Sequence, residues 1–289
     1  MQKLWVLCLL FPVAAFSQSR VHLTIFGGVS NYQGDLQAKA FTLDQSNLAL
    51  GLGVKYDLMP NFALRAGLNY GTLEATDARN KPELRFRNLS FASRLVEGNF
   101  LLEYTLFDME DKKISPYAFA GVAVYHFDPY AFDSVGRKVC LQPLSTEGQG
   151  LSQYPDRKPY KLTQFAIPFG AGVKFRVGYN TVLAYEIGLR KIFTDYLDDV
   201  SETYVDQFVL AQERGLKAVE MSYRAGELNE GDPNYPADGT IRGGSKYKDW
   251  YYFTGFTVYI GINSGRGGGG FGGRAGKRGS LDCPPVPKY

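Results

Sequence analysis

The chain has 289 residues and a net charge of +3, and it is 45% hydrophobic and 15% aromatic, with 20 tyrosines and 20 phenylalanines. A charge this close to neutral argues neither for nor against nucleic acid, whereas the aromatic excess suits the interfacial girdles of a membrane protein. After the first 17 residues no segment approaches 18 consecutive apolar residues. The composition therefore excludes a helical membrane protein.

Residues 1–17 have the form of a secretory signal peptide. Lys3 supplies the positive charge, the following stretch of about 13 residues is apolar, and Ala15 and Ser17 place small residues before the cleavage point. We predict cleavage near Ser17/Gln18 and hence an exported protein. Cys8 lies inside the apolar stretch, which argues against a lipoprotein.

Eight segments of alternating character follow in chain order. They are 21–32, 47–58, 61–73, 89–106, 115–128, 162–177, 181–194 and 250–262. Short links rich in Pro, Asn, Gly and Asp alternate with longer links of about 14 to 55 residues. Short periplasmic turns and long outer loops are typical of outer-membrane barrels. We predict an all-β fold, an eight-stranded antiparallel transmembrane barrel over 18–263, located in the outer membrane with both termini periplasmic.

The alternation also assigns the two faces of each strand. In 162–177 the large apolar residues from Phe165 to Phe175 share one face, which we expect to meet lipid. In the fifth strand the same reasoning turns Tyr117, Phe119, Tyr125 and Phe127 outward. In the fourth strand it turns Arg94 outward near the outer end of the strand, which predicts a β-bulge or a slip in parity there.

The opposite face of these strands is predicted to carry a charge network in the lumen. Its members are Lys55, Arg65, Glu97, Glu103, Lys174, Arg176, Glu186 and Arg190, with Asn69 among them. Charges inside a narrow barrel must be paired. Because eight strands leave a lumen just wide enough for side chains, we expect a closed scaffold rather than a pore.

Two stretches stand apart from the strands. Residues 202–224 carry an approximate helical stripe interrupted by Gly215, which predicts a helix or helix pair in the last outer loop. Residues 264–289 begin with a glycine-rich run and predict a flexible periplasmic tail. We expect this tail to bind a partner through its basic and proline-rich end, at Arg274, Lys277, Arg278, Cys283 and Pro284.

The mature chain has two cysteines, Cys140 in an outer loop and Cys283 in the tail. The predicted topology places them on opposite sides of the membrane. We therefore expect no disulfide between them.

The sequence offers little for metal, cofactor or substrate chemistry. With only His22 and His126, and no Cys-x-x-Cys, we predict no metal site, and the tail glycines do not form a nucleotide-binding loop, so we predict no cofactor and no small-molecule substrate. One enzymatic alternative remains. His126 and Asp128, predicted to face inward at the outer rim near Asp35 and Asp195, could activate water as in an omptin-like protease.

Five segments carry a resemblance that extends over most of the mature chain. They are 31–36 (Asn-Tyr-Gln-Gly-Asp-Leu), 115–122 (Ser-Pro-Tyr-Ala-Phe-Ala-Gly-Val), 194–201 (Thr-Asp-Tyr-Leu-Asp-Asp-Val-Ser), 248–251 (Lys-Asp-Trp-Tyr) and 283–284 (Cys-Pro). In them the chain resembles the PorG-like outer-membrane barrels of Bacteroidota, a component of the type IX secretion system. The resemblance implies a non-enzymatic barrel that contacts the periplasmic lipoprotein ring of that system. The long glycine-rich tail departs from the family pattern.

Three functions are therefore carried forward. The first is a structural, non-enzymatic component or relative of the type IX secretion machinery, in contact with outer-membrane lipid and a periplasmic lipoprotein ring and with no nucleic acid. The second is a surface barrel of the OmpA/OmpX type for adhesion or envelope integrity. The third is a hydrolase active at the rim.

Overall fold

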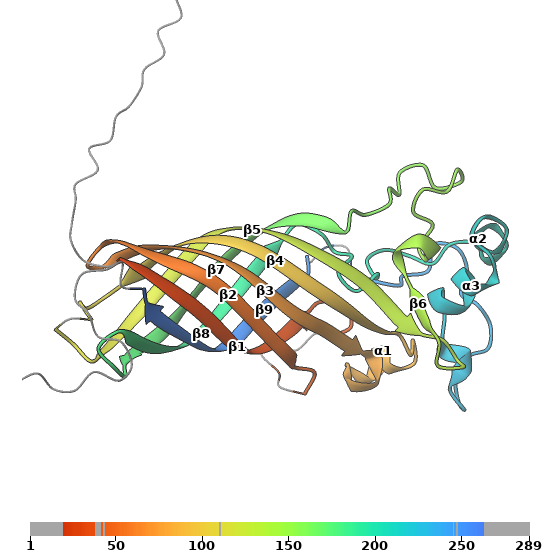
Figure 1. Cartoon of the computed structure of the whole chain (residues 1–289). Helices are drawn as coiled ribbons and strands as arrows, with labels where there is room; N and C mark the ends of the chain where they lie inside the picture. The colour runs from red at the N-terminus through yellow and green to blue at the C-terminus, as the bar shows by residue number, and fades with distance from the viewer. Residues whose placement is uncertain are drawn as a thin grey trace, which may run out of the picture. The chain divides into compact units, whose positions relative to one another are not determined.

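The computed structural model describes residues 20–37, 42, 44–109, 111–244, 246 and 248–262 (Figure 1). The predicted signal peptide therefore lies outside the described residues. The same is true of the five tail positions predicted to bind a partner, Arg274, Lys277, Arg278, Cys283 and Pro284.

Eight long antiparallel strands form a closed barrel. They are β1 (Val21–Gln33), β2 (Asn47–Met59), β3 (Phe62–Thr76), β4 (Ser90–Thr105), β5 (Ile114–Phe132), β7 (Thr163–Arg176), β8 (Thr181–Ile192) and β9 (Trp250–Gly261). Neighbours pair in the order β4-β3-β2-β1-β9-β8-β7-β5, and pairing between β4 and β5 closes the ring. A short ninth strand, β6 (Lys138–Cys140), pairs with the end of β5. The predicted fold class is confirmed.

The strands follow the predicted segments closely, but the predicted bulge in β4 is wrong. Pairing of β4 with both β3 and β5 runs without a register shift. A shift occurs instead between Asp57 and Met59, beside the first short turn. Arg94 does point outward, and the regular pairing of β4 accommodates it without a bulge.

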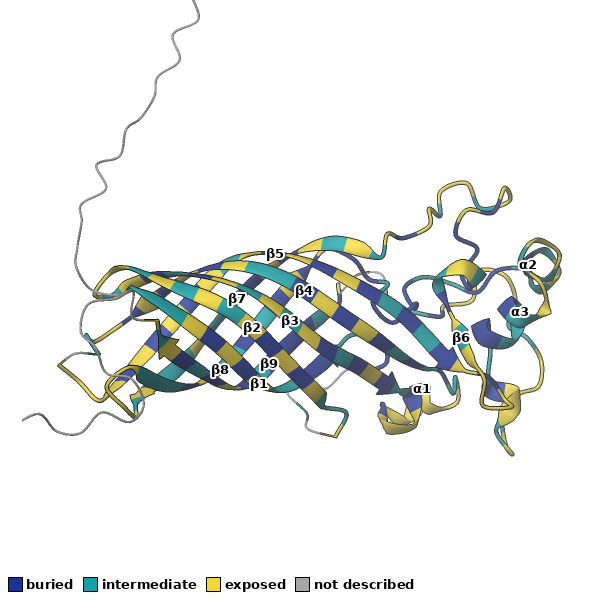
Figure 2. Ribbon diagram, viewed as in Figure 1, coloured by how far each residue is buried: buried dark blue, intermediate teal, exposed yellow. Residues whose placement is uncertain are grey.

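Apolar side chains ring the outer wall of the barrel. Figure 2 shows buried and exposed residues alternating along every long strand. Leu52, Leu68, Val122 and Phe165 are each more than 60% exposed, and they come from four different strands. A contiguous apolar surface of this extent is stable only when it is covered, and a closed barrel leaves no strand edge to satisfy. This wall faces lipid, and the chain is an outer-membrane β-barrel.

The predicted faces of β5 are reversed in the structure. Tyr117, Phe119, Tyr125 and Phe127 are buried in the lumen, and the smaller alternate residues face outward. Glycines on β7 and β8 leave room for the first two rings. A Cβ atom built on Gly172 would lie 2.7 Å from the ring of Tyr117, and one on Gly170 would lie 2.6 Å from the ring of Phe119.

The four long connections gather at one end of the barrel, called here the long-loop end, opposite the short turns (Figure 1). They contain η1 (Asp77–Arg79), α1 (Pro82–Arg85), η2 (Gln142–Leu144), α2 (Gln207–Arg214), α3 (Leu216–Ser222) and η3 (Ala225–Glu227). The predicted helix pair is confirmed. Asp206 caps α2 through its side chain, and Gly215 separates the helices with a φ of 88°, a value that favours glycine.

In the described part of the chain, no helix combines the length and the apolar character needed to cross a membrane.

The long-loop end has a hydrophobic core of its own. Leu73, Leu95 and Phe127 from the barrel strands pack in one cluster with loop residues that include Leu197 and Met221. The half of the barrel nearest the long loops and the loops themselves are therefore one folded unit, and the loops close the barrel at this end.

Candidate functional site

The lumen contains two levels of paired charges. The lower level, which is the one nearer the short turns, is built around Arg65. Its guanidinium lies 2.8 Å from a Glu186 carboxylate oxygen and donates to the Tyr259 hydroxyl at 2.7 Å. Glu103 lies 3.6 Å from the same guanidinium and pairs with Lys174 at 2.5 Å. All four charged side chains are buried. Each charge has an opposite charge within reach, as burial in a narrow lumen requires.

The upper level is built around Glu97, which is fully buried. Arg190 donates to both of its carboxylate oxygens, at 2.8 and 3.0 Å. Asn69, Asn99 and Tyr251 each donate to it at 2.9 Å. A carboxylate with this many donors is held in one position, and it joins four strands, β3, β4, β8 and β9, across the lumen.

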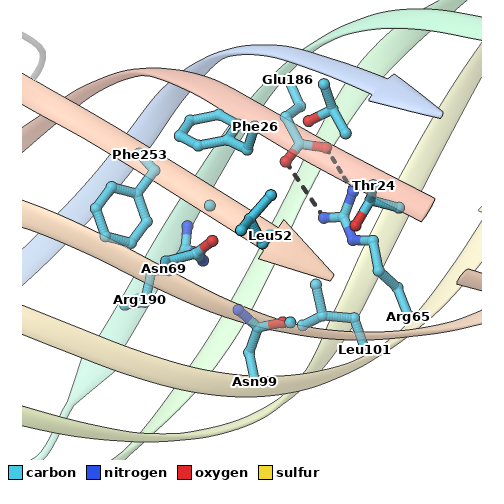
Figure 3. Close-up of a pocket in the computed structure, with 13 residues that line it drawn as sticks. Thr24, Phe26, Leu52, Arg65, Asn69, Asn99, Leu101, Glu186, Arg190 and Phe253 are labelled. Atoms are coloured by element: carbon cyan, nitrogen blue, oxygen red, sulfur yellow. Dashed lines mark hydrogen bonds and ion pairs between the residues drawn. The ribbon is translucent and has the colours of Figure 1, made fainter. Parts of the chain in front are cut away.

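Between the two levels lies a cavity of about 30 Å³, shown in Figure 3. Arg65 and Glu186 of the lower level line it together with Arg190, Asn69 and Asn99 of the upper level. A polar cavity of this volume has room for about one water molecule. It is far too small to serve as a solute path.

Two of the predicted lumen residues lie outside these clusters. Lys55 pairs with Asp57 at 2.8 Å near the short-turn end, where His22 also contacts Asp57 at 2.6 Å. Arg176 is half-buried close to the last short turn. These two cations therefore belong to the mouth of the barrel rather than to its centre.

The long-loop end holds a buried acidic cluster that sequence reasoning did not find. The hydroxyl of Tyr32 lies 2.5 Å from Asp198 and 3.2 Å from Asp249, and these two carboxyls also accept the backbone N–H groups of Val200 and Leu197. A tyrosine hydroxyl has only one proton to donate. If both contacts are hydrogen bonds, one carboxyl must itself be protonated.

The electrostatics of this cluster agree with a retained proton. Burial raises the pKa values of Asp198 and Asp249 well above the ordinary range, and a neighbouring carboxyl, Asp35 for Asp198 and Asp198 for Asp249, raises each of them further. Burial also raises the pKa of Asp195 to about 6, and one of its carboxyl oxygens is buried with no hydrogen-bond partner among the described residues. The signal that could have found this cluster is positional, because 31–36, 194–201 and 248–251 all lie where a strand meets a long loop.

A buried arginine ties the long loops together above this cluster. Arg242 donates to the Glu147 carboxylate at 2.9 Å, to the Asp199 carbonyl at 2.6 Å and to the Ser222 carbonyl at 3.1 Å. Asp199 in turn accepts from the hydroxyls of Thr146 and Tyr160. Burial raises the pKa of Asp199 to about 6, although Arg242 lowers it. The loops between β5 and β7 and between β8 and β9 are therefore joined by polar contacts as well as by packing.

The predicted catalytic grouping at the rim does not form. Because the faces of β5 are reversed, His126 is exposed on the outer wall, and its Nδ1 lies 2.9 Å from the Thr163 hydroxyl. Asp128 shares that outward face, whereas Asp195 is buried in the loops and Asp35 accepts the Gly244 N–H. The inward placement predicted for His126 and Asp128 is wrong. Among the residues described, no group of three His, Cys, Asp or Glu side chains is arranged to hold a metal ion.

A closed antiparallel barrel with an apolar wall and a filled polar lumen defines the class as a small outer-membrane β-barrel. Over residues 2–213 the sequence matches the family described as "Domain of unknown function (DUF6089)". The match covers well over half of the chain, and the protein belongs to this family. No match was found among the curated proteins.

Solved structures of other outer-membrane barrels are similar at low sequence identity. Neisserial surface protein A (NspA) has 8% identity and a TM-score of 0.42, over 84% of this chain and 98% of that one. OprG from Pseudomonas aeruginosa has 11% identity and a TM-score of 0.38, over 85% and 99%. Ail, the attachment invasion locus protein of Yersinia pestis, has 8% identity and a TM-score of 0.38, over 84% and 98%. The class assigned above depends on the strand pairing and the apolar wall of this chain.

Proposed function

We propose that this protein is a non-enzymatic structural component of the outer membrane, and a PorG-like component or relative of the type IX secretion machinery. The observation that supports a scaffold is the filled lumen, in which Arg65, Glu97, Glu103, Lys174, Glu186 and Arg190 are buried and paired. A barrel filled in this way supplies a rigid wall and two surfaces, but no path for a solute. Its function then depends on the molecules that the two ends of the barrel contact.

In this proposal the long-loop end faces outside and both termini are periplasmic. The first and last residues of the barrel strands, Val21 and Gly261, lie at the same end of the barrel as the short turns, as in an exported barrel. A tail that begins at residue 264 then enters the periplasm. There its basic end can meet an acidic partner such as a component of a lipoprotein ring.

The test is a pull-down of the tagged full-length protein from solubilised outer membranes, with bound proteins identified by mass spectrometry. We expect periplasmic lipoproteins with the full chain and their loss when the chain ends after residue 264. Folding of the truncated barrel is checked by heat-modifiable gel mobility. A truncated barrel that retains the partner would move the binding site to the periplasmic turns. Absence of any periplasmic lipoprotein from the full-chain sample would contradict the secretion role.

An adhesive surface barrel is the second candidate, and exposed apolar side chains at the long-loop end favour it. Phe208, Leu216 and Ile241 are 75%, 79% and 77% exposed. Cells that carry Phe208→Ser with Leu216→Ser would lose attachment if these side chains bind a surface. Unchanged attachment, with the pull-down partner retained, would leave only the secretion role. Any hydrolase activity lost in His126→Ala would contradict both structural functions.

A further inference from the structure

The connection between β8 and β9 meets the same tyrosine at both of its ends. Tyr32, fully buried near the end of β1, contacts Asp198 shortly after β8 and Asp249 immediately before β9. Between these two contacts the connection carries α2, α3 and η3 (Figure 1). A change at this one hydroxyl therefore acts on both ends of the connection.

The hydrogen bonds assign the protons among these three side chains. Asp198 has two donors, the Tyr32 hydroxyl at 2.5 Å and the Val200 N–H at 3.0 Å, and the shorter distance is that of a bond to an ionised carboxylate. The tyrosine then has no proton left for its second contact, to Asp249 at 3.2 Å. Asp249 has one other donor, the Leu197 N–H at 2.9 Å, which reaches its second oxygen. The contact is a hydrogen bond only if Asp249 is a carboxylic acid that donates to Tyr32.

The ionisable groups around this pair give no cation to a second carboxylate. They are Asp35 after β1, Arg87 between β3 and β4, Tyr125 on β5, and Asp195, Arg242 and Lys248 in the connection itself. Arg87 is paired with Asp77 at 2.8 Å, and Arg242 is paired with Glu147 at 2.9 Å. The Lys248 side chain is exposed. Burial raises the pKa of Asp249, and Asp198, Asp195 and Asp35 raise it further, which agrees with the assignment from geometry.

We propose that Asp249 stays a carboxylic acid in the folded protein and that its proton fastens the long-loop end to the barrel. The chain of hydrogen bonds runs from Asp249 to Tyr32 and from Tyr32 to Asp198, and it is called here the proton clasp. When the proton leaves, two buried carboxylates share one hydroxyl and repel each other, and both ends of the connection separate from β1. The device requires neither a secretion role nor a particular orientation in the membrane.

The direction of the pH dependence follows from the proton count. An exposed aspartate loses its proton near about pH 4, whereas the clasp keeps it at higher pH. The closed connection therefore binds one proton more than the open one, and the stabilisation by the clasp is complete in acid. It decreases as the pH rises, until Asp249 titrates within the closed form. The clasp is thus a switch that opens in alkali.

Infrared spectroscopy of the full chain in lipid vesicles at about pH 8 tests the proton assignment, because a carboxylic acid and a carboxylate absorb at different frequencies. Burial raises the pKa values of Asp195 and Asp199 only to about 6, so both are ionised at this pH. We expect a carboxylic acid band that is lost in Asp249→Asn and kept in Glu74→Gln, an exposed carboxyl used as the control. Tyr32→Phe removes the acceptor and should shift the band. A wild type without the band, or a band that survives in Asp249→Asn, would overturn the assignment.

Amide exchange at Leu197 and Val200, whose N–H groups bond to the two carboxyls, tests the opening. Asp249→Asn keeps a donor for Tyr32 but has no proton to lose, and heat-modifiable gel mobility checks that it folds. The exchange rate of the wild type divided by that of Asp249→Asn at the same pH should rise by up to about tenfold per pH unit above about pH 6.5. The same ratio for Glu213→Gln, an exposed carboxyl of the same connection, should match that of the wild type. A wild-type ratio that stays constant with pH would overturn the clasp.

Discussion

The substitution Glu97→Gln removes one negative charge from the centre of the upper lumen cluster and changes almost no volume. Glu97 accepts two hydrogen bonds from Arg190 and one each from Asn69, Asn99 and Tyr251. Charge-assisted bonds contribute about 1.5–3 kcal/mol each, and breaking a buried ion pair by neutralising one partner costs about 3–5 kcal/mol. We expect the free energy of unfolding to fall by about 3–5 kcal/mol, because the Arg190 charge stays buried without a counter-charge.

The assay is guanidinium unfolding of the barrel in lipid vesicles, followed by tryptophan fluorescence. The chain has two tryptophans, and Trp5 lies in the predicted signal peptide, so Trp250 at the start of β9 is the reporter. Glu74→Gln, the same change at an exposed carboxylate, is the control and should cost under about 0.5 kcal/mol. Adding Arg190→Met to Glu97→Gln should recover most of the loss, since no buried charge then remains. A loss below about 1 kcal/mol for Glu97→Gln alone would refute the reasoning.

Three other measurements follow from the same geometry. In planar bilayers the purified protein should show little conductance, and a steady porin-sized current would disprove the filled lumen. The carboxyls of Asp195 and Asp199, with pKa values raised to about 6, bind more protons folded than unfolded, so the stability they contribute is lost as pH rises from about 4 to 6. Amide exchange in the loop after β8 should therefore be slower at pH 5 than at pH 7.5, by up to about 2–3 kcal/mol in opening free energy. Asp199→Asn should reduce this difference, and equal exchange at both pH values would contradict it. Finally, a membrane-impermeant thiol reagent on whole cells should label the exposed Cys140, with Cys140→Ser as control, and spare Cys283. Labelling only after the outer membrane is opened would reverse the proposed orientation.

The number, order and approximate limits of the strands were predictable from the sequence, because each depends on local information. Alternation with a period of two marks a strand with one apolar and one polar face, and the short turns carry Pro, Asn and Gly where the chain must reverse. The helix break at Gly215 is equally local. So is the outward face of β7, where Phe165 and Phe169 alternate with Ala166 and Gly170.

The faces of β5 depended on the tertiary structure, because both of its faces are apolar and alternation alone does not say which is inside. Only the neighbouring strands decide. Gly170 and Gly172 on β7 leave space in the lumen for Phe119 and Tyr117, and an Ala or Val facing lipid on β5 costs nothing. Because His126 has the opposite parity to these rings, it faces outward instead of inward.

The partners within the lumen also came from the three-dimensional structure. Arg65 meets Glu186 across 121 positions of sequence, and Tyr32 meets Asp249 across 217. Such pairs depend on the stagger of strands around a closed barrel, which is the sum of every register in the ring. A local pattern shows that a charged side chain faces inward. Which residue it meets across the lumen depends on the relative heights of the strands, and these are fixed only when the barrel closes.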